Sequence, residues 1–480
     1  MYMKFHPTSW LLLCALGANT IAAKAQQAQL TPADRQLARD VFKELIEINT
    51  TDSVGSTTLA AEAMRKRLLS AGFSSDDLQV LGPNSRKGNL VARYRGRPGG
   101  SLKPLLIIAH IDVVEARRED WSTDPFQFTE KDGFFYGRGT QDMKNSDAAA
   151  VVSLIKLKRE GFVPDRDIIL ALTADEEGGS SNGVDWLLKN HRSLVDAGFA
   201  LNPDSGGLTT VKGKPIDLDV EATEKLYADF HFTATNSGGH SSLPTPDNAI
   251  YHVAAALQKL QQYRFPAELN TVTRGYFEAL SKIEHGAVAA DMRAVLQIPL
   301  DGAVVERLSQ SPRYNSTLRT TCVATMMQAG HAPNALPQRA QANVNCRILP
   351  GHTPGEVRRQ LEAVIGDAAV EVKLVADAAS DSNENEVSIT PPPLNREIFD
   401  ALHVVVERTW PGLPIVPEME TGASDSKITM AAGIPSYGFS AMGVDTGDVR
   451  AHGRDERIGV ESYYTGVQFY YNFLKQLTGK

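Results

Sequence analysis

Residues 105–112 read LLIIAHID, a short apolar run that ends in a histidine and an aspartate two positions apart. An apolar run of this length between polar segments is typical of a buried strand in a parallel sheet. Residues 168–177 repeat the pattern, because the run IILAL is followed by Asp175, Glu176 and Glu177. In open α/β sheets, ligands bind beyond the carboxyl ends of the strands. The two stretches therefore predict an α/β fold with a polar site at one edge of the sheet.

The residue types at these strand ends are those of a metal site. Imidazole and carboxylate groups bind divalent ions such as zinc, and a pair of ions needs about five protein ligands, including a bridging carboxylate. His110 and Asp112 point to the same side of a strand end, which suits a ligand and a carboxylate that orients its ring. Glu176 and Glu177 point differently, so one can bind metal while the other acts as a general base. These residues predict a hydrolase with two metal ions.

Five motifs occur in a fixed order along the chain. They are AHIDVV at 109–114, GRGTQDMK at 137–144, TADEEGG at 173–179, GGHSS at 238–242 and AHG at 451–453. With this ordered set the chain resembles the co-catalytic metallopeptidase family of carboxypeptidase G, aminoacylase, the carnosine-type dipeptidases and the succinyl-diaminopimelate desuccinylases. Each motif alone is a weak signal, but the ordered set is specific and spans most of the chain.

The resemblance implies a ligand set for two Zn²⁺ ions, with Co²⁺ or Mn²⁺ as alternatives for the same ligands. Asp142 would bridge the two ions. His110 and Asp204 would complete one metal position, and Glu177 and His452 would complete the other.

The resemblance also implies the residues that carry out the reaction. Glu176 would be the general base, and Asp112 would hold the ring of His110. The peptide bond after Asp142 would be cis, a form that folded proteins rarely adopt outside proline. His240 would donate a hydrogen bond to the oxyanion of the tetrahedral intermediate. In dimeric relatives this histidine comes from the neighbouring subunit, so a homodimer is expected.

The expected substrate contacts lie further along the chain. Arg347 matches the family arginine that binds a substrate carboxylate, for which a guanidinium group is well shaped. Asn334, Gly422 and Ser424 fall where relatives contact the same end of the substrate. The chain departs from the family here, because Ala423 and Ser424 replace a common glycine and threonine.

The implied function is hydrolysis of the amide bond next to a C-terminal amino acid. A carboxypeptidase and an N-acyl-amino-acid deacylase both fit, with a small peptide or an N-acyl amino acid as substrate. An aminopeptidase or dipeptidase on the same metal site is an alternative. The Gly-x-Ser-x-Gly pattern at 179–183 also permits a serine hydrolase that uses Ser181. A non-catalytic binding protein would be expected to have lost some of the ligands or the base.

The N-terminus has the features of a secretory signal peptide at residues 1–25. Lys4 supplies the positive end, residues 10–18 an apolar core, and Ala23-Lys24-Ala25 a small-residue cleavage site. The expected location is therefore secreted or periplasmic, with no membrane association after cleavage.

Two of the three cysteines remain after removal of this peptide. Cys322 and Cys346 lie in the strand-like runs 317–327 and 339–349, whose antiparallel pairing would place them nearly opposite. A disulfide is compatible with export. Two buried thiols are the favoured interpretation, and neither cysteine is expected to be catalytic.

Composition limits the other classes of function. The 480 residues are 42% hydrophobic and 22% charged, which suffices for two packed domains. The formal net charge is -8 and the sequence pI is about 5.8. Because nucleic-acid binding depends on a basic field, this balance argues against a nucleic-acid partner.

The order of expected elements divides the chain into two domains. Residues 26–221 and 389–480 form a zinc-exopeptidase-like α/β domain with a mixed central sheet flanked by helices. Residues 222–388 form an inserted α+β lid or dimerisation domain with the ferredoxin-like order βαββαβ. Its expected elements are the strand 226–234, the helix 247–262, two strands on either side of Asn334, the helix 354–365 and the strand 370–375. The segment 270–316 within it is expected to be mostly helical.

Overall fold

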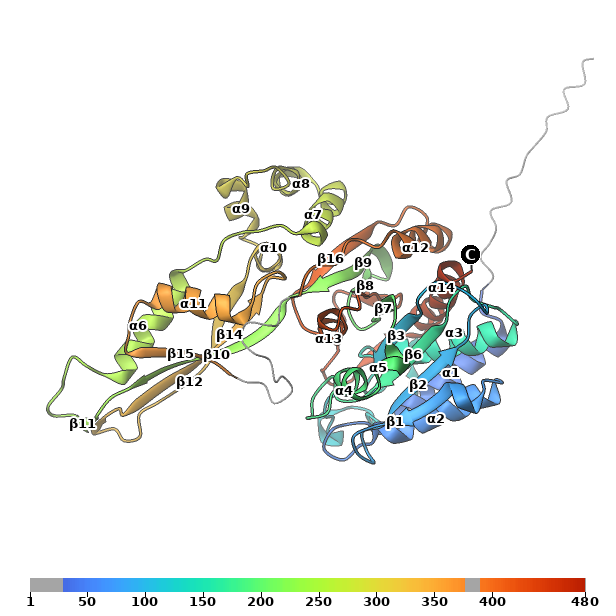
Figure 1. Ribbon diagram of the computed structural model, residues 1–480, viewed down its shortest axis with the longest axis horizontal. Coiled ribbons are helices and arrows are strands. Elements are labelled where there is room, and N and C mark those ends of the chain that lie inside the picture. Colours follow the sequence, from blue (N-terminus) through green and yellow to red (C-terminus); the bar gives the residue numbers. More distant parts are fainter. Residues whose placement is uncertain (1–28, 376–388, 480) are drawn as a thin grey trace, which may run out of the picture.

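The apolar run at Leu105–His110 forms strand β3 in the computed structural model, which describes residues 29–375 and 389–479. β3 lies inside a six-stranded sheet of order β1-β2-β6-β3-β7-β17 (Figure 1). The other strands are β1 Leu78–Leu81, β2 Asn89–Tyr94, β6 Ile168–Thr173, β7 Phe199–Leu201 and β17 Ser436–Tyr437. β6, β3, β7 and β17 are parallel, whereas β2 is antiparallel to β1 and β6. The predicted mixed α/β sheet is confirmed.

Helices cover both faces of this sheet. One face carries α1 Pro32–Glu47, α2 Thr57–Ser70, α3 Lys144–Arg159, α12 Arg396–Thr409 and α14 Val460–Leu477, and the other carries α4 Gly183–Asn190, α5 Arg192–Val195 and α13 Ser426–Ala431. Successive strand residues point to opposite faces, so Ile107 packs with the first group and Ile108 with the second. This double cover explains why every residue of β3 and β6 is buried.

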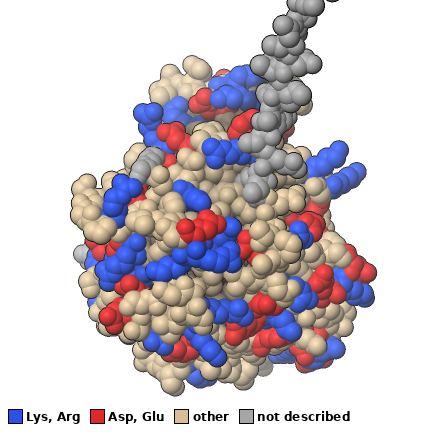
Figure 2. All heavy atoms as spheres, turned by 90° about the vertical axis from the view of Figure 1, so that its right-hand side faces the viewer, with Lys and Arg blue, Asp and Glu red and all other residues tan. Residues whose placement is uncertain are grey.

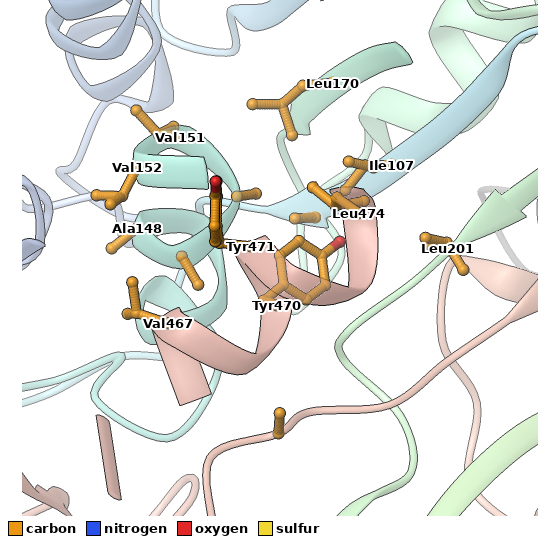
Figure 3. Close-up of a cluster of buried hydrophobic side chains, with 14 of the residues drawn as sticks. Ile107, Ala148, Val151, Val152, Leu170, Leu201, Val467, Tyr470, Tyr471 and Leu474 are labelled. Carbon is orange, nitrogen blue, oxygen red and sulfur yellow. The ribbon is translucent and has the colours of Figure 1, made fainter. Parts of the chain in front are cut away.

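The contact between α3 and α14 is the centre of the larger core. Figure 3 shows Val151 and Val152 of α3 near Val467 and Tyr471 of α14, with Leu170 of the sheet beside them. α3 begins directly after the loop that contains Asp142, so this packing fixes the start of α3 next to the predicted site. None of the helices in the described parts of the chain is long and apolar enough to cross a membrane.

The six-stranded sheet and its covering helices form the lobe that carries the predicted site, called the catalytic lobe here, and two smaller sheets extend it. The first has the order β19-β5-β4, with β4 Thr129–Lys131, β5 Phe134–Tyr136 and β19 Arg457–Gly459. The second has the order β16-β9-β8-β18, with β8 Gly207–Val211, β9 Lys214–Glu224, β16 Ile415–Glu420 and β18 Val444–Asp445. Short 3-10 helices occur at Ser75–Asp77 and Arg118–Asp120. On the face of this lobe seen in Figure 2, basic and acidic side chains are interspersed.

The second lobe has the predicted βαββαβ order. Its antiparallel sheet is β12-β14-β10-β15, with β10 Leu226–Thr235, β12 Thr321–Ala329, β14 Arg339–Ile348 and β15 Val370–Leu374. Helices α6 Ala249–Gln262 and α11 Pro354–Ile365 pack against it around a separate apolar core. A two-stranded ribbon, β11 Gly239–His240 and β13 Ala335–Leu336, extends from this lobe. The predicted signal peptide and the predicted end of the lid near residue 388 lie outside the described residues.

A helical insertion packs against the strands that join the two lobes. It consists of α7 Thr271–Ile283, α8 Gly286–Ala294, α9 Gly302–Leu308 and α10 Pro312–Leu318. A Cβ at Gly275 would lie 2.8 Å from Pro417 Cγ, so the missing side chain permits close packing of α7 on β16. Arg313 of α10 lies 3.5 Å from Asp219 and 3.1 Å from Glu418, on β9 and β16 respectively. The strand expected from residue 317 begins only at 321, because α10 continues to Leu318.

The two cysteines form a disulfide. Cys322 of β12 and Cys346 of β14 are direct partners in the antiparallel register, with their Cα atoms 4.1 Å apart. This register brings the two sulfur atoms within bonding distance, so the favoured interpretation of two buried thiols is wrong. The disulfide attaches the edge strand β12 to the interior of the sheet.

We expect reduction of this disulfide to destabilise the second lobe by about 3 kcal/mol, because the bond closes a loop with a sequence separation of 24 residues. Chemical denaturation with and without reductant measures the change. The double variant Cys322→Ala/Cys346→Ala is the control. Its unfolding transition should match that of the reduced wild type and should not change when reductant is added. A wild-type transition that is unaffected by reductant would contradict the expectation.

Candidate metal centre

Six predicted side chains meet beyond the carboxyl ends of β3, β6 and β7. They are His110, Asp142, Glu176, Glu177, Asp204 and His452. The three strands are parallel, so the residues that end or follow them share one edge of the sheet. Asp142 and His452 come from two loops outside this sheet, before α3 and between β18 and β19. The site is therefore assembled from five separate segments of the chain.

Asp142 lies between the two histidines. Its Oδ1 is 3.1 Å from His110 Nε2, and its Oδ2 is 3.0 Å from His452 Nε2. His110 Nε2 is also 3.5 Å from Asp204 Oδ1, and His452 Nε2 is 2.9 Å from Glu177 Oε2. Each imidazole thus has its own second carboxylate, while Asp142 serves both. This is the arrangement expected of a bridging ligand.

The atoms of this group fit divalent metal ions. His110 Nε2 and Asp142 Oδ1 are both buried, yet neither has a hydrogen-bond partner among the described residues. Buried polar atoms are normally hydrogen-bonded. These two atoms lie close together without forming a hydrogen bond, an arrangement that suits a cation bound by both. Ligand atoms of His110, Asp142 and Glu177 lie within 4.8 Å of one another, as do those of His110, Glu176 and Asp204. Nitrogen and oxygen donors of these kinds are ligands of zinc and similar ions.

The titration of the site reflects its crowded charges. Burial raises the pKa of Glu176 to about 9, and the nearby carboxylates of Asp204 and Asp425 add to the shift. Burial likewise raises the pKa of Glu177 to about 7, with a further contribution from Asp142. A pocket that holds several carboxylates at such short range is strongly stabilised by a bound cation.

Asp112 holds the backbone of the two glutamates in the site. Its two carboxylate oxygens accept hydrogen bonds from the backbone N–H groups of Glu176, at 3.2 Å, and Glu177, at 3.0 Å. Its Oδ1 lies 3.7 Å from Nδ1 of His110, while the carbonyl oxygen of Asp112 is closer to that ring atom, at 3.2 Å. Asp112 therefore fixes the two glutamates directly, in addition to lying beside the ring of His110.

Sequence reasoning missed the residue that holds the backbone of the Asp142 loop. Glu456 is fully buried and accepts backbone N–H groups from Gly139, at 3.1 Å, and Asp142, at 3.1 Å. It also forms a buried ion pair with Arg138, at 2.7 Å. The peptide bond Asp142–Met143 is cis, as predicted. No motif surrounds Glu456 in the sequence, so only its contacts identify it.

A second set of missed residues holds the loop after β6. Asp175 has a positive φ of 59° and forms a buried ion pair with Lys87. Asn182 donates a hydrogen bond of 2.6 Å to Asp425, whose pKa burial raises to about 6. Asp425 directly follows Ser424, which the sequence had indicated as a substrate contact, but Asp425 itself was not among the predicted site residues.

The serine of the Gly-x-Ser-x-Gly pattern belongs to the same loop. The backbone N–H of Ser181 donates to Asp175 at 3.2 Å, and a Cβ at Gly179 would lie only 2.4 Å from Asp175 Oδ2. The glycines therefore let this loop wrap closely around a buried carboxylate. No hydrogen bond joins the Ser181 hydroxyl to a histidine within the described ranges, so this geometry gives no support to a serine nucleophile.

Two of the predicted residues lie far from the metal ligands of their own chain. His240 lies in β11, and Asn334 directly precedes β13. Figure 1 places the ribbon of β11 and β13 at the opposite end of the second lobe from the catalytic lobe. The backbone N–H of Ser241 donates to the carbonyl of Asn334 at 3.1 Å, so the two residues are held side by side. Within a single chain, His240 and Asn334 do not lie close to the metal ligands.

The remaining predicted substrate contacts differ in accessibility. The guanidinium of Arg347 lies 4.7 Å above the ring of Tyr227, and its buried Nη1 has no hydrogen-bond partner in the described part of the chain. The backbone N–H of Gly422 donates to Glu420 at 2.7 Å. Ser424 is only 2% exposed, and its hydroxyl donates to Glu224 at 2.9 Å. The substrate roles of these residues stay predictions.

A protein-family model supplies the identification. The model described as Peptidase family M20/M25/M40 matches residues 106–476. The chain belongs to this family.

Relatives in the M20 family agree with this assignment. The chain is 31% identical to the N-fatty-acyl-amino acid synthase/hydrolase PM20D1 of Xenopus tropicalis, over 78% of this chain and 72% of that protein. It is 30% identical to the probable carboxypeptidase S-like 2 of Dictyostelium discoideum, over 81% and 74% of the two chains. The fold is similar to that of the M20 family metallo-carboxypeptidase Sso-CP2 from Sulfolobus solfataricus, with a TM-score of 0.68 and 18% identity over 92% and 99% of the chains. The protein is a metal-dependent amidohydrolase.

We expect Asp112→Asn to weaken the binding of divalent metal about 10–100-fold, as is usual when a residue behind the ligands is lost. An amide at this position can accept only one of the two backbone hydrogen bonds and turns its NH₂ group toward the other N–H. Titration of chelator-stripped protein with Zn²⁺ measures the effect. Asp132→Asn is the matched control, because its side chain is 75% exposed in the turn between β4 and β5. Equal affinities in the two variants would contradict this role of Asp112.

Proposed function

We propose that the protein is a secreted or periplasmic dizinc hydrolase that cleaves the amide bond next to a C-terminal amino acid. The position of Asp142, with one oxygen toward each histidine, is the observation that carries the two-ion part of the proposal. The relatives are named as N-fatty-acyl-amino acid synthase/hydrolase, carboxypeptidase S and aminoacylase-1, which supports N-acyl amino acids or peptides as substrates. The disulfide and the signal-like N-terminus support export.

Glu176 is the residue that moves protons in this proposal. Two divalent ions, when bound, would polarise the substrate carbonyl and make the attacking water more acidic. Glu176 takes a proton from that water as its oxygen attacks the carbonyl carbon. The same carboxyl then gives the proton to the amine nitrogen as the C–N bond breaks, so the products are a carboxylate and a free amino acid.

Arg347 accounts for the preference for a free carboxylate. Its buried Nη1 still has a hydrogen bond to make, and the ring of Tyr227 supports the guanidinium from one side. A carboxylate can accept from such a guanidinium in a charge-assisted pair. A substrate with a blocked C-terminus would leave this donor unused, which costs binding energy.

We expect Zn²⁺ to restore the release of free amino acid by chelator-stripped protein, from a panel of N-acyl amino acids and dipeptides. In Glu176→Gln the turnover should fall about 10²–10⁴-fold, because the amide cannot accept the proton. Glu119→Gln, at an exposed acid, is the matched control. Amino-acid release is measured together with the bound metal per chain.

The metal content separates two roles for Glu176, since its ligand atom also lies within range of those of His110 and Asp204. A general base can be replaced without loss of metal, whereas loss of one ion in Glu176→Gln would identify a ligand instead. Activity that survives chelation would overturn the metal mechanism. Cleavage of substrates with blocked carboxylates as fast as free ones would overturn the role of Arg347.

The second lobe supports a homodimer. β12 is an edge strand, and Val323, Met326 and Met327 are 60%, 63% and 48% exposed. Together with α6 it borders a groove of about 980 Å³. A long apolar edge strand is normally covered, and a second copy of β12 would supply both the missing backbone partner and an apolar face. A second copy would also bring a ribbon that carries His240 toward a metal centre that lacks one.

The ring of His240 is arranged as a donor. The backbone N–H of Ser242 donates to Nδ1 of His240 at 3.2 Å, and the Ser242 hydroxyl lies 2.7 Å from the same atom. Because a backbone N–H can only donate, Nδ1 must accept, which leaves the proton of a neutral ring on Nε2. This tautomer suits a hydrogen bond from Nε2 to an oxyanion.

We expect co-expressed Glu176→Gln and His240→Ala chains to recover roughly a quarter of wild-type activity, although each variant alone is inactive. Half of the dimers would be mixed, and each mixed dimer would contain one complete site made from both chains. Activity of the mixed dimer, isolated with two different affinity tags, is the measurement. If His240 acts within its own chain, the mixture remains inactive.

A further inference from the structure

Two loops that carry metal ligands run side by side. The loop at 137–142 follows β5 and contains Asp142, and the loop at 446–456 precedes β19 and contains His452. β5 and β19 are antiparallel neighbours, with Arg457 opposite Tyr136. The ladder continues beyond the strands, because the backbone N–H of Gly137 donates to the carbonyl of Glu456 at 3.1 Å. The two loops therefore adjoin the same end of the β5/β19 strand pair.

The side chain of Gln141 joins these loops through four hydrogen bonds. Its Oε1 accepts the backbone N–H groups of Arg450, at 2.7 Å, and Ala451, at 3.0 Å. Its Nε2 donates to the carbonyl oxygens of Asp448, at 3.2 Å, and Arg457, at 2.8 Å. A primary amide has two donors and two acceptor positions, so Gln141 uses its full capacity on the backbone of the second loop and of Arg457, the first residue of β19.

Glu456 makes the reciprocal connection. Its Oε1 accepts the backbone N–H groups of Gln141, at 2.6 Å, and Asp142, at 3.1 Å. A side chain of the first loop thus holds the backbone of the second, and a side chain of the second holds the backbone of the first. The contact fixes Asp142 and His452 relative to one another.

His452 depends on this support more than the other ligands do. Its side chain is 56% exposed, whereas that of His110 is only 2% exposed within the sheet. The backbone of His452 has a positive φ of 61°, a conformation that non-glycine residues seldom adopt and that the surrounding loop must hold. The two residues directly before it are those whose N–H groups bind Gln141.

We propose that Gln141 is a positioning residue for His452 and so controls the affinity of one of the two metal positions. The inference rests on the proposed two-ion function. Gln141 does not contact a reacting atom; it acts through the loop that presents the imidazole. Residues that orient metal ligands typically change metal affinity about 10–100-fold when replaced. His110 ends strand β3, Asp204 follows β7, and the backbone N–H of the shared Asp142 is held by Glu456 rather than by the side chain of Gln141. The metal position of His110 and Asp204 should therefore not share this loss.

The test is competitive titration of the chelator-stripped full-length chain with Zn²⁺, which measures both affinities. Gln141→Glu keeps the size and both acceptor contacts but loses the two donated hydrogen bonds, and Gln141→Ala loses all four. His452→Ala and Asp204→Asn show which affinity belongs to which position. Gln127→Ala, at an exposed glutamine of the same lobe, is the matched control.

We expect both Gln141 variants to lose the affinity that His452→Ala loses, by about 10–100-fold, and to keep the one that Asp204→Asn loses. Thermal unfolding of the variants checks that the fold is retained. Two unchanged affinities, or an equal fall in both, would overturn the inference. A wild-type chain that binds only one ion would overturn the two-ion proposal itself, so the two failures are distinguishable.

Discussion

Asp142 directs its two oxygens to two different imidazoles, and much of the catalytic lobe serves to hold it there. Carboxylates at such short range repel one another unless cations, backbone N–H groups or protons take up their charge. The chain provides N–H groups systematically: Glu456 binds those of the Asp142 loop, and Asp112 binds those of Glu176 and Glu177. The ligand atoms of His110, Asp142 and Glu177 lie within 4.8 Å of one another, close enough to share a divalent ion.

Packing and hydrogen bonds connect the metal ligands directly to the buried core. His110 is the last residue of a fully buried strand, so its position follows from the packing of the sheet. Lys144 follows Asp142 by two residues, and its buried Nζ donates to the carbonyl oxygens of Leu45 and Ile48 at the end of α1. The start of α3 is therefore fixed to α1 as well as to α14. The backbone of His452, by contrast, belongs to a loop outside this sheet. Side-chain contacts that hold the loop therefore affect the position of this ligand.

The sequence predicted those parts of the site that follow from local pattern. His110 comes directly after one apolar run and Glu177 follows another within five residues, and runs of that kind can be identified as buried strands without a structure. The βαββαβ order of the second lobe was predictable for the same reason. Glu456 and Gln141 could not be found, because their partners lie more than 300 residues away and neither type is unusual in a loop. The disulfide was misjudged because pattern gives an approximate register, whereas bond formation depends on the two cysteines being direct partners.

The second lobe connects stability to the proposed assembly. The disulfide attaches β12 to β14, so it holds in place the same edge strand that the proposed homodimer would cover. An edge strand that frays presents no regular row of backbone groups and pairs poorly with a second strand. The helical insertion, through Arg313, contacts β9 and β16, the strands that join the lobes, and so supports the connection between the lobes. In the proposed homodimer, a partner chain that supplied His240 would depend on both the disulfide and the insertion, because an oxyanion donor is effective only when it is held in position before the charge develops.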